Sequence, residues 1–246
     1  MIKLGLLGHP VVHSKSPEFF AEKLESIGRT DVEYVAIDLT DIDDFDEVVR
    51  EHTGVMGFNV TIPHKESIMA KLSCLDEEAE EVGAVNTIVK IERGWKGYNT
   101  DVWGFSRSLT PFIKGRHERA LILGSGGAAK AVEYCLGRLG IETVIVSRTA
   151  GEGKVVYKDL TEAAMGHYLL VVNCTPLGTW PKIDGCVDIP WGSVGEMHLC
   201  VDLVYNPEET TFIKRAKEKG ATVVNGGEML RMQAERSLEI WLENGL

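Results

Sequence analysis

The segment RALILGSGGAAKAVEYCLGRLG, which begins at Arg119, limits the possible folds more than any other part of the chain. It reads as an apolar strand, a glycine-rich turn and an amphipathic helix, the order of a dinucleotide-binding βα unit. Gly124, Gly126 and Gly127 let the backbone turn tightly and approach a pyrophosphate. The helix predicted to open at Ala128 offers unpaired N–H groups to the same anion. A glycine string alone is a weak signal, but here the flanking strand and helix supply the context that it requires.

A second strand is predicted at residues 143–147, and Arg148 follows it directly. Enzymes that use NAD usually carry Asp or Glu at this strand end, where the carboxylate binds the ribose 2′-hydroxyl. An arginine suits a 2′-phosphate instead, because the guanidinium matches phosphate geometry. The position therefore favours NADP over NAD; the alternative is an ordinary exposed loop arginine.

The rest of the chain alternates predicted strands and helices, which indicates an α/β fold with a mainly parallel first sheet. Arg93 and Gly94 predict a hairpin turn, so the edge of that sheet should be antiparallel. At 246 residues with 44% hydrophobic composition, the chain has the length for two modest domains with real cores. The further predicted strands are 3–7, 32–38, 55–60, 84–92, 95–99, 169–173, 199–203 and 222–224, and the predicted helices are 17–27, 43–52, 101–109, 211–219 and 227–244.

The stretch GFNVTIPHKE places Asn59, Thr61 and Lys65 at a strand end and the turn that follows it. Pro63 suits the first position of a helix, which would put Lys65 in the first helical turn. The helix macrodipole disfavours a cation there, so we expect a lowered pKa that lets the lysine exchange protons near neutrality. The alternative is a solvent-facing lysine whose charge Glu66 offsets.

Three other short segments carry polar groups whose roles the sequence leaves open. Ser14 and Ser16 precede a helix and can point at one anion, although Ser16 can equally cap that helix. Asn86 lies in an otherwise apolar predicted strand, where a buried amide needs backbone or a bound polyol as partner. Asp101 stands where a strand enters a helix, so it is a candidate N-cap as well as a candidate catalyst.

Composition excludes several classes of partner. The net charge of −11 and the pI near 5.2 argue against binding to nucleic acid or to an anionic membrane. No signal peptide or long apolar span is expected, and an odd number of cysteines without paired metal spacing indicates reduced thiols in a cytoplasmic protein. His9 and His13 are four positions apart, but Pro10 makes a helical metal site improbable, so we expect no metal. The cysteines are Cys74, Cys135, Cys174, Cys186 and Cys200.

Over nearly its whole length the chain resembles the shikimate dehydrogenase family. The motifs that carry the resemblance are GHPVVHSKSP, GFNVTIPHKE, GAVNT, YNTD, GSGGAAKA, NCTPLG, VDLVYNP and GGEMLRMQA, in that order. The resemblance implies NADPH-dependent, reversible reduction of 3-dehydroshikimate to shikimate, a step toward chorismate and the aromatic amino acids. It also implies an N-terminal α/β substrate domain over 1–100, completed by a C-terminal helix at 227–246, a Rossmann-type NADP domain over 101–226, and an active-site cleft between them.

The resemblance also implies roles for individual residues. Lys65 and Asp101 look like the catalytic pair, with the lysine as proton donor and acceptor and the aspartate orienting it. Ser14, Ser16 and Tyr205 look like the carboxylate site, while Asn59, Thr61, Asn86 and Gln233 look like hydroxyl-binding and supporting groups. The cofactor contacts implied are Gly124, Ser125, Gly126, Gly127, Ala128, Arg148, Thr149, Thr175 and Gly226. The expected partner is the small-molecule substrate, and the expected assembly is a monomer or homodimer.

The chain departs from the family pattern in three places. In the cofactor region SRT replaces NRT, and Lys130 stands in place of an arginine. Only about two dozen residues separate Arg148 from Asn173, and TAGEGKVVYKDL is too rich in glycine and β-branched residues for the expected helix. One crossover is therefore abbreviated, and a second basic contact to the phosphate is lost unless Lys154 replaces it. Cys174 stands where alanine is common, and we interpret it as a small packed residue.

Two alternative functions remain from the sequence alone. One is a quinate/shikimate dehydrogenase that prefers NAD, against which Arg148 and the missing ribose-binding acid count. The other is a non-catalytic binding or regulatory protein on the same fold, against which the intact Lys65 and Asp101 count.

Overall fold

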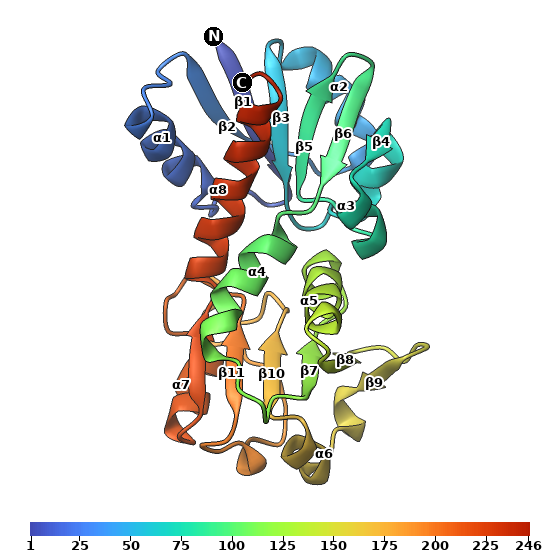
Figure 1. Ribbon diagram of the computed structural model, residues 1–246, viewed down its shortest axis with the longest axis vertical. Helices are drawn as coiled ribbons and strands as arrows, with labels where there is room; N and C mark the ends of the chain where they lie inside the picture. Colours follow the sequence, from blue (N-terminus) through green and yellow to red (C-terminus); the bar gives the residue numbers. More distant parts are fainter. The chain divides into compact units, whose positions relative to one another are not determined.

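The computed structural model describes all residues 1–246, and the chain divides into two compact units. The first comprises Met1–Trp103 and Gln233–Leu246, and the second comprises Gly104–Met232 (Figure 1). The divisions fall within two helices, α4 (Asp101–Leu109) and α8 (Gly227–Glu243).

The first unit is built on a mixed six-stranded sheet with the order β2-β1-β3-β5-β6-β4. Its parallel part is formed by apolar strands that match the predicted ranges within a residue or so. The antiparallel hairpin of β5 and β6 forms at the predicted turn, with Ile91 paired to Gly94, but the edge strand of the sheet is the short β4, which is parallel to β6. The strands are β1 (Ile2–Gly8), β2 (Val32–Asp38), β3 (Val55–Val60), β4 (Cys74–Leu75), β5 (Thr87–Ile91) and β6 (Gly94–Tyr98).

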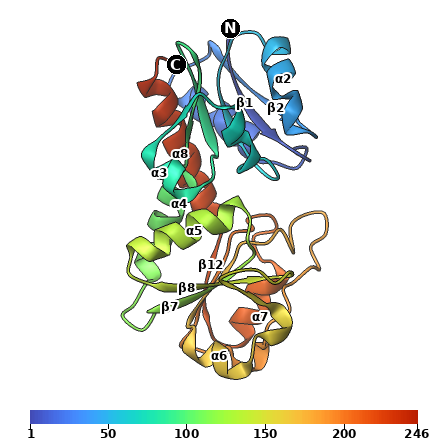
Figure 2. The same ribbon diagram turned by 90° about the vertical axis from the view of Figure 1, so that its right-hand side faces the viewer.

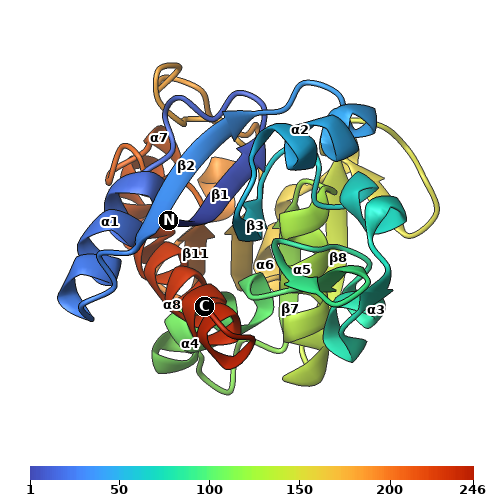
Figure 3. The same ribbon diagram turned by 90° about the horizontal axis from the view of Figure 1, so that it is seen from above.

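Helices cover both faces of this sheet. One face packs against α1 (Ser16–Ser26) and the C-terminal part of α8, which meet the sheet side by side in Figure 3. The other face packs against α2 (Phe45–Glu51) and α3 (Glu77–Val82), together with the 3₁₀ helix η2 (Ser67–Lys71). The α8 side chain Trp241 is buried, and its Nε1 donates to the carbonyl of Ile88 at 3.0 Å. A Cβ atom on Gly57 would lie 2.3 Å from that nitrogen, so glycine is required for α8 to approach the sheet.

The second unit is built on an all-parallel six-stranded sheet with the order β12-β11-β10-β7-β8-β9. This is the strand order of a doubly wound dinucleotide-binding domain, as the glycine-rich βα unit predicts. The strands are β7 (Arg119–Leu123), β8 (Glu142–Ser147), β9 (Lys154–Val156), β10 (Leu170–Asn173), β11 (Leu199–Asp202) and β12 (Thr222–Asn225).

The helices of the second unit lie on opposite faces of its sheet. Figure 2 shows α5 (Gly127–Arg138) on one side, and α6 (Glu162–His167) with α7 (Thr211–Glu218) on the other. Met165 of α6 and Phe212 of α7 pack with Leu121 and Val171 of the strands in one buried cluster. The fold therefore has a layered core of the kind that parallel α/β sheets require.

The crossover between β8 and β10 is short, as the sequence predicts. It holds the three-residue strand β9, the 3₁₀ helix η4 (Tyr157–Asp159) and the six-residue helix α6, with no long helix. Two other predictions need correction: β5 begins only at Thr87, and no α-helix begins at Pro63.

Candidate active site

Lys65 and Asp101 form an ion pair in the first unit, with 2.5 Å between Lys65 Nζ and Asp101 Oδ2. Their side chains are 15% and 5% exposed, so water screens the pair weakly. Lys65 lies in a turn after β3 that leads into η2, not in the first turn of an α-helix. The helix macrodipole predicted to act on Lys65 is therefore absent, because no α-helix begins at that position.

Asp101 is the first residue of α4, but its side chain does not cap the helix. Asn99 accepts the Val102 N–H at 3.2 Å, which satisfies that end of the helix. The Asp101 carboxylate instead receives Lys65 on one oxygen and the Asn86 amide, at 2.9 Å, on the other. Of the two roles that the sequence left open, the geometry favours the one in which Asp101 holds the lysine.

Asn86 is the centre of the hydrogen bonds around this pair. It lies at a bend just before β5 rather than inside the strand, and it is buried. Its Nδ2 donates to Asp101, Thr100 Oγ1 and Gln233 Oε1, at 2.9, 2.9 and 3.2 Å. Its Oδ1 accepts the Thr100 N–H at 2.7 Å. Protein groups therefore satisfy this buried amide and fix its orientation.

A second buried network joins Asn59 to two residues that the sequence did not single out. Tyr34 donates to Asn59 Oδ1 at 2.9 Å, and Asn59 Nδ2 donates to Ser237 Oγ at 2.9 Å. Ser237 also lies 2.7 Å from Thr87 Oγ1 and donates to the Gln233 carbonyl. Since Ser237 is four positions after Gln233 on α8, helical spacing is the one sequence signal that could have identified it.

Ser14 and Ser16 lie at the N-terminal end of α1. Ser16 is the first residue of α1, and its N–H donates to Ser14 Oγ at 3.2 Å. The N-cap residue of this helix is Lys15, whose side chain makes no capping hydrogen bond, so Ser16 is not the cap. Burial raises the pKa of Tyr34 well above its usual value, and a hydrogen bond with Ser16 opposes that rise. The two serines and Asn59 are thus linked through Tyr34.

Gly8 brings the end of β1 against Thr61. A Cβ atom on Gly8 would lie 2.3 Å from Thr61 Cγ2 and 2.9 Å from the Ile62 carbonyl. Any larger residue would push Thr61 away from β1. The remaining predicted substrate residue, Tyr205, lies in the second unit, in the loop that follows β11.

The glycine-rich turn of the second unit has the features of an anion site. Gly124 has a φ of 113°, which only glycine adopts without strain, and its virtual Cβ lies 3.3 Å from Thr175 Cγ2. The helix α5 begins at Gly127, one residue before the predicted start. Its N-cap, Gly126, has no capping side chain, and no atom lies within 4 Å of a Cβ built there. With Ser125 and Ala128 alongside, this open helix end fits a pyrophosphate.

The loop after β10 is held by a buried carboxylate. Thr175 donates to Asn173 Oδ1 at 2.7 Å, and Asn173 Nδ2 donates to Asp202 Oδ1 at 2.9 Å. Asp202 also accepts from Thr210 Oγ1 at 2.5 Å and from the Val204 N–H at 3.1 Å. Burial raises the pKa of Asp202 to about 6, although these donors favour the ionised form.

Gly226, Arg148 and Thr149 complete the predicted cofactor residues. A Cβ atom on Gly226 would lie 2.0 Å from the Leu203 carbonyl oxygen, so the close approach of these two backbone segments also requires glycine. Arg148 and Thr149 are exposed just beyond β8, and Ser147 Oγ donates to the Thr149 carbonyl. Arg148 lines a cavity of about 610 Å³.

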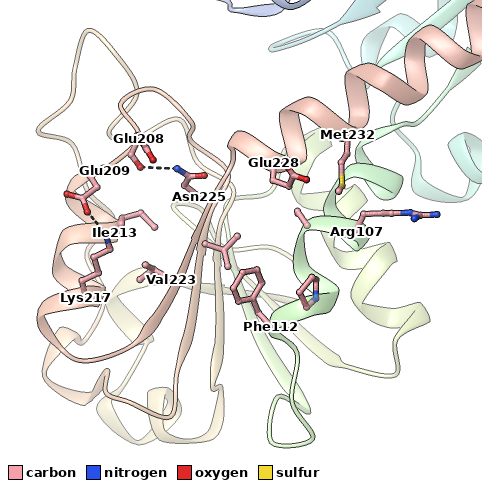
Figure 4. A pocket seen from close by; sticks show the side chains of 13 residues that line it. Arg107, Phe112, Glu208, Glu209, Ile213, Lys217, Val223, Asn225, Glu228 and Met232 are labelled. Carbon is pink, nitrogen blue, oxygen red and sulfur yellow. Dashed lines mark hydrogen bonds and ion pairs between the residues drawn. The ribbon is translucent and has the colours of Figure 1, made fainter.

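A larger pocket of about 820 Å³ lies elsewhere in the second unit, along the edge strand β12 (Figure 4). Phe112, Val223 and Met232 give it apolar walls, and Glu228 and Arg107 lie at its rim. None of the predicted site residues lines it. This pocket is therefore separate from the predicted site residues.

The chain is similar to known proteins over nearly its full length. Residues 6–88 match the model of the shikimate dehydrogenase substrate binding domain. The shikimate dehydrogenase (NADP(+)) of Caldanaerobacter subterraneus subsp. tengcongensis is 36% identical over 96% of this chain and 90% of the relative.

Solved structures show the same similarity. Shikimate 5-dehydrogenase from Thermus thermophilus, solved with NADP(H) and shikimate, matches with a TM-score of 0.86 at 32% identity, covering 99% of this chain and 94% of that chain. Quinate dehydrogenase from Corynebacterium glutamicum, solved with NAD, matches with a TM-score of 0.84 at 27% identity, covering 98% and 94%. The chain described here belongs to the shikimate dehydrogenase family.

Proposed function

We propose that this chain is an NADP-dependent shikimate dehydrogenase, which interconverts 3-dehydroshikimate and shikimate. The observation that carries the proposal is the Lys65–Asp101 pair, which the Asn86 amide holds in place. The relatives named shikimate dehydrogenase (NADP(+)) support the same activity.

Lys65 is the proton donor to the ketone oxygen in the reductive direction. Negative charge grows on that oxygen as the carbonyl is reduced, and an adjacent ammonium both stabilises the charge and delivers a proton. Asp101 restricts the lysine side chain, and Asn86 in turn restricts Asp101. In the oxidative direction the same amine receives the proton of the substrate hydroxyl.

Hydroxyl and amide groups of the first unit bind the cyclic polyol. Thr61 and Gln233 contact ring hydroxyls. Asn59 and Asn86 fix the positions of the neighbouring side chains Ser237 and Gln233 through buried hydrogen bonds. The serine pair, Ser14 and Ser16, binds the substrate carboxylate together with Tyr205. Polar pocket groups left without partners cost ~1–3 kcal/mol each, so such a site discriminates against substrates that lack the matching hydroxyls.

The second unit, Gly104–Met232, which corresponds to the domain expected over 101–226, binds NADP. Bound NADPH supplies the hydride that reduces the C3 ketone. The open end of α5 at Gly126 binds the pyrophosphate, and Arg148 with Thr149 contacts the 2′-phosphate. Thr175 and Gly226 lie at the carboxyl ends of β10 and β12, the edge of a parallel sheet where ligands bind.

An absorbance assay of nicotinamide reduction tests this function, with shikimate or quinate offered against NADP or NAD. We expect turnover with shikimate and NADP to exceed the other three combinations. A preference for quinate with NAD would make the chain a quinate dehydrogenase instead. No turnover with any pair would leave a non-catalytic binding protein.

Location and assembly form a separate part of the proposal. No helix of the structure is both long enough and apolar enough to cross a membrane. We propose a cytoplasmic enzyme that is a monomer or a homodimer. Light scattering of the purified chain measures the assembly, and fractionation of the source cells tests the location.

A further inference from the structure

A cavity of about 610 Å³ opens next to Arg148 in the second unit. Two of its six lining side chains are cations, Arg148 and Lys158, and one is a carboxylate, Asp159. The remaining wall is formed by Ala150, Val156 and Tyr157. Such a mixture of an aromatic wall and excess positive charge suits an anionic group attached to a ring system.

The pairing of β8 with β9 determines which residues reach this cavity. The two strands are parallel, and Ser147 pairs with Val156. Arg148 and Tyr157 therefore leave their strands side by side, and Lys158 follows one position later. Arg148 is close enough to lower the pKa of Tyr157, which burial raises to about 12. These residues lie at the carboxyl ends of the strands, where parallel sheets bind ligands.

The same register excludes Lys154, the lysine that the sequence offered as a replacement contact. Lys154 pairs with Ile145 at the amino end of β9. At about 3.3 Å per residue, it lies roughly 10 Å along the strand from Tyr157. Its side chain folds back toward Gly151, where a virtual Cβ lies 3.5 Å from Lys154 Cδ. It does not line the cavity.

Neither cation of the cavity forms an ion pair with a carboxylate. Other cations of the second unit do form such pairs, as Lys217 does with Glu209 and Arg119 with Glu142. Arg148 and Lys158 form no such ion pair, and both are exposed. Two free cations against the single charge of Asp159 leave the cavity with a net positive charge.

We propose that Lys158 is a specificity-determining residue, which binds the 2′-phosphate of NADP together with Arg148. The inference rests on the proposed NADP-dependent function. The short crossover has no long helix to provide a second basic group, and its 3₁₀ helix η4 provides Lys158 instead. Asp159 beside it reduces the attraction for the phosphate and sets an upper limit on the preference for NADP.

The test measures the affinity of the intact chain for each probe, by tryptophan fluorescence or by calorimetry. The variants are Lys158→Ala, the matched control Lys154→Ala, and Lys158→Arg. The probes are NADP, NAD and adenosine 2′,5′-bisphosphate, which carries the 2′-phosphate without nicotinamide. Circular dichroism establishes that each variant is folded, which we expect because both lysines are exposed.

We expect Lys158→Ala to lower the affinity for NADP and for the bisphosphate about tenfold, the usual effect of losing one charge-assisted contact. The affinity for NAD should change by less than about twofold. Lys154→Ala should change no affinity, and Lys158→Arg should restore most of the loss. Asp159→Asn should tighten NADP.

An unchanged NADP affinity in Lys158→Ala, an equal loss for NAD, or the loss appearing in Lys154→Ala would each overturn the assignment. These outcomes leave the proposed function standing. If the unmodified chain binds neither dinucleotide, the proposed function fails and this inference fails with it.

Discussion

Asn86 draws the partners of its side-chain amide from two separate parts of the chain. Its amide meets Asp101 and Thr100, which follow the hairpin, and Gln233, which is 147 positions away. The sequence indicated that a buried amide needs partners, but it could not say which, because they meet only after the sheet and α8 are in place. Tyr34 and Ser237 were missed for the same reason.

We expect Lys65→Ala to lower kcat for shikimate oxidation by about 10²- to 10⁴-fold, the usual contribution of a positioned proton donor. NADP affinity should be unchanged, because Lys65 belongs to the first unit and the cofactor groups to the second. Steady-state kinetics and fluorescence titration measure the two effects. Lys71→Ala, which removes a surface pair with Asp43, is the matched control and should keep full activity. Weakened NADP binding in Lys65→Ala would assign the lysine another role.

Ser237→Ala should reduce the free energy of unfolding by about 1–3 kcal/mol, because it removes one buried hydrogen-bond partner from each of Asn59 and Thr87. Urea denaturation measures the change. Ser26→Ala, on the exposed end of α1, should stay within about 0.5 kcal/mol. Similar values for both serines would mean that Ser237 contributes no more than a surface hydroxyl.

At the scale of secondary structure, the long apolar segments were predictable and the short ones were not. The strands β1, β2, β3 and β7 and the helix α5 have enough residues for a clear period, and the structure confirms them. The elements β4, β9, α3 and α6, which span two to six residues, are too short to show one. The helix expected at Pro63 failed because a proline turn and a 3₁₀ helix satisfy the same local preferences.

Thr210 links two elements of the second unit, and we expect its loss to cost more than that of an ordinary cap. It accepts the Ile213 N–H as the N-cap of α7 and donates to buried Asp202. Thr210→Ala should therefore reduce the unfolding free energy by about 2–4 kcal/mol, the sum of a cap and a hydrogen bond to a charge. Thr161→Ala removes only the cap of α6 and should cost about 1 kcal/mol. If thermal or chemical denaturation showed that Thr210→Ala and Thr161→Ala reduce the unfolding free energy equally, the stabilising role of the Thr210–Asp202 hydrogen bond would be contradicted.

At the scale of the whole molecule, two buried groups make stability depend on pH in opposite directions. Burial lowers the pKa of His117, so the unfolded chain binds the proton more tightly and this contribution to stability is lost as pH falls below about 6.5. Asp202 has a folded pKa of about 6 against an ordinary value of 3.8, so the folded chain binds its proton more tightly. The stability that Asp202 contributes is complete at low pH and is lost as pH rises through about 6.

Asp202→Asn distinguishes the contribution of Asp202 to the pH dependence of stability from that of His117, because His117 is present in both the variant and the unmodified chain. The unfolding free energy of the variant relative to the unmodified chain should rise by about 3 kcal/mol between pH 4 and pH 7, the equivalent of a shift of about two pKa units. Urea titrations at a series of pH values measure this difference. A difference that does not change with pH would show that Asp202 titrates as an ordinary carboxyl.

The contribution of α8 to the first unit bears on how the polypeptide is synthesised. Leu238 and Trp241 fill the same core as Leu4 and Phe20, at the opposite end of the chain. The ribosome must therefore release almost the entire product before the N-terminal sheet can cover its second face, whereas residues 104–232 are continuous and can fold earlier. In nascent chains stalled with residue 232 just outside the exit tunnel, we expect protease-resistant fragments from the second unit and none from the first.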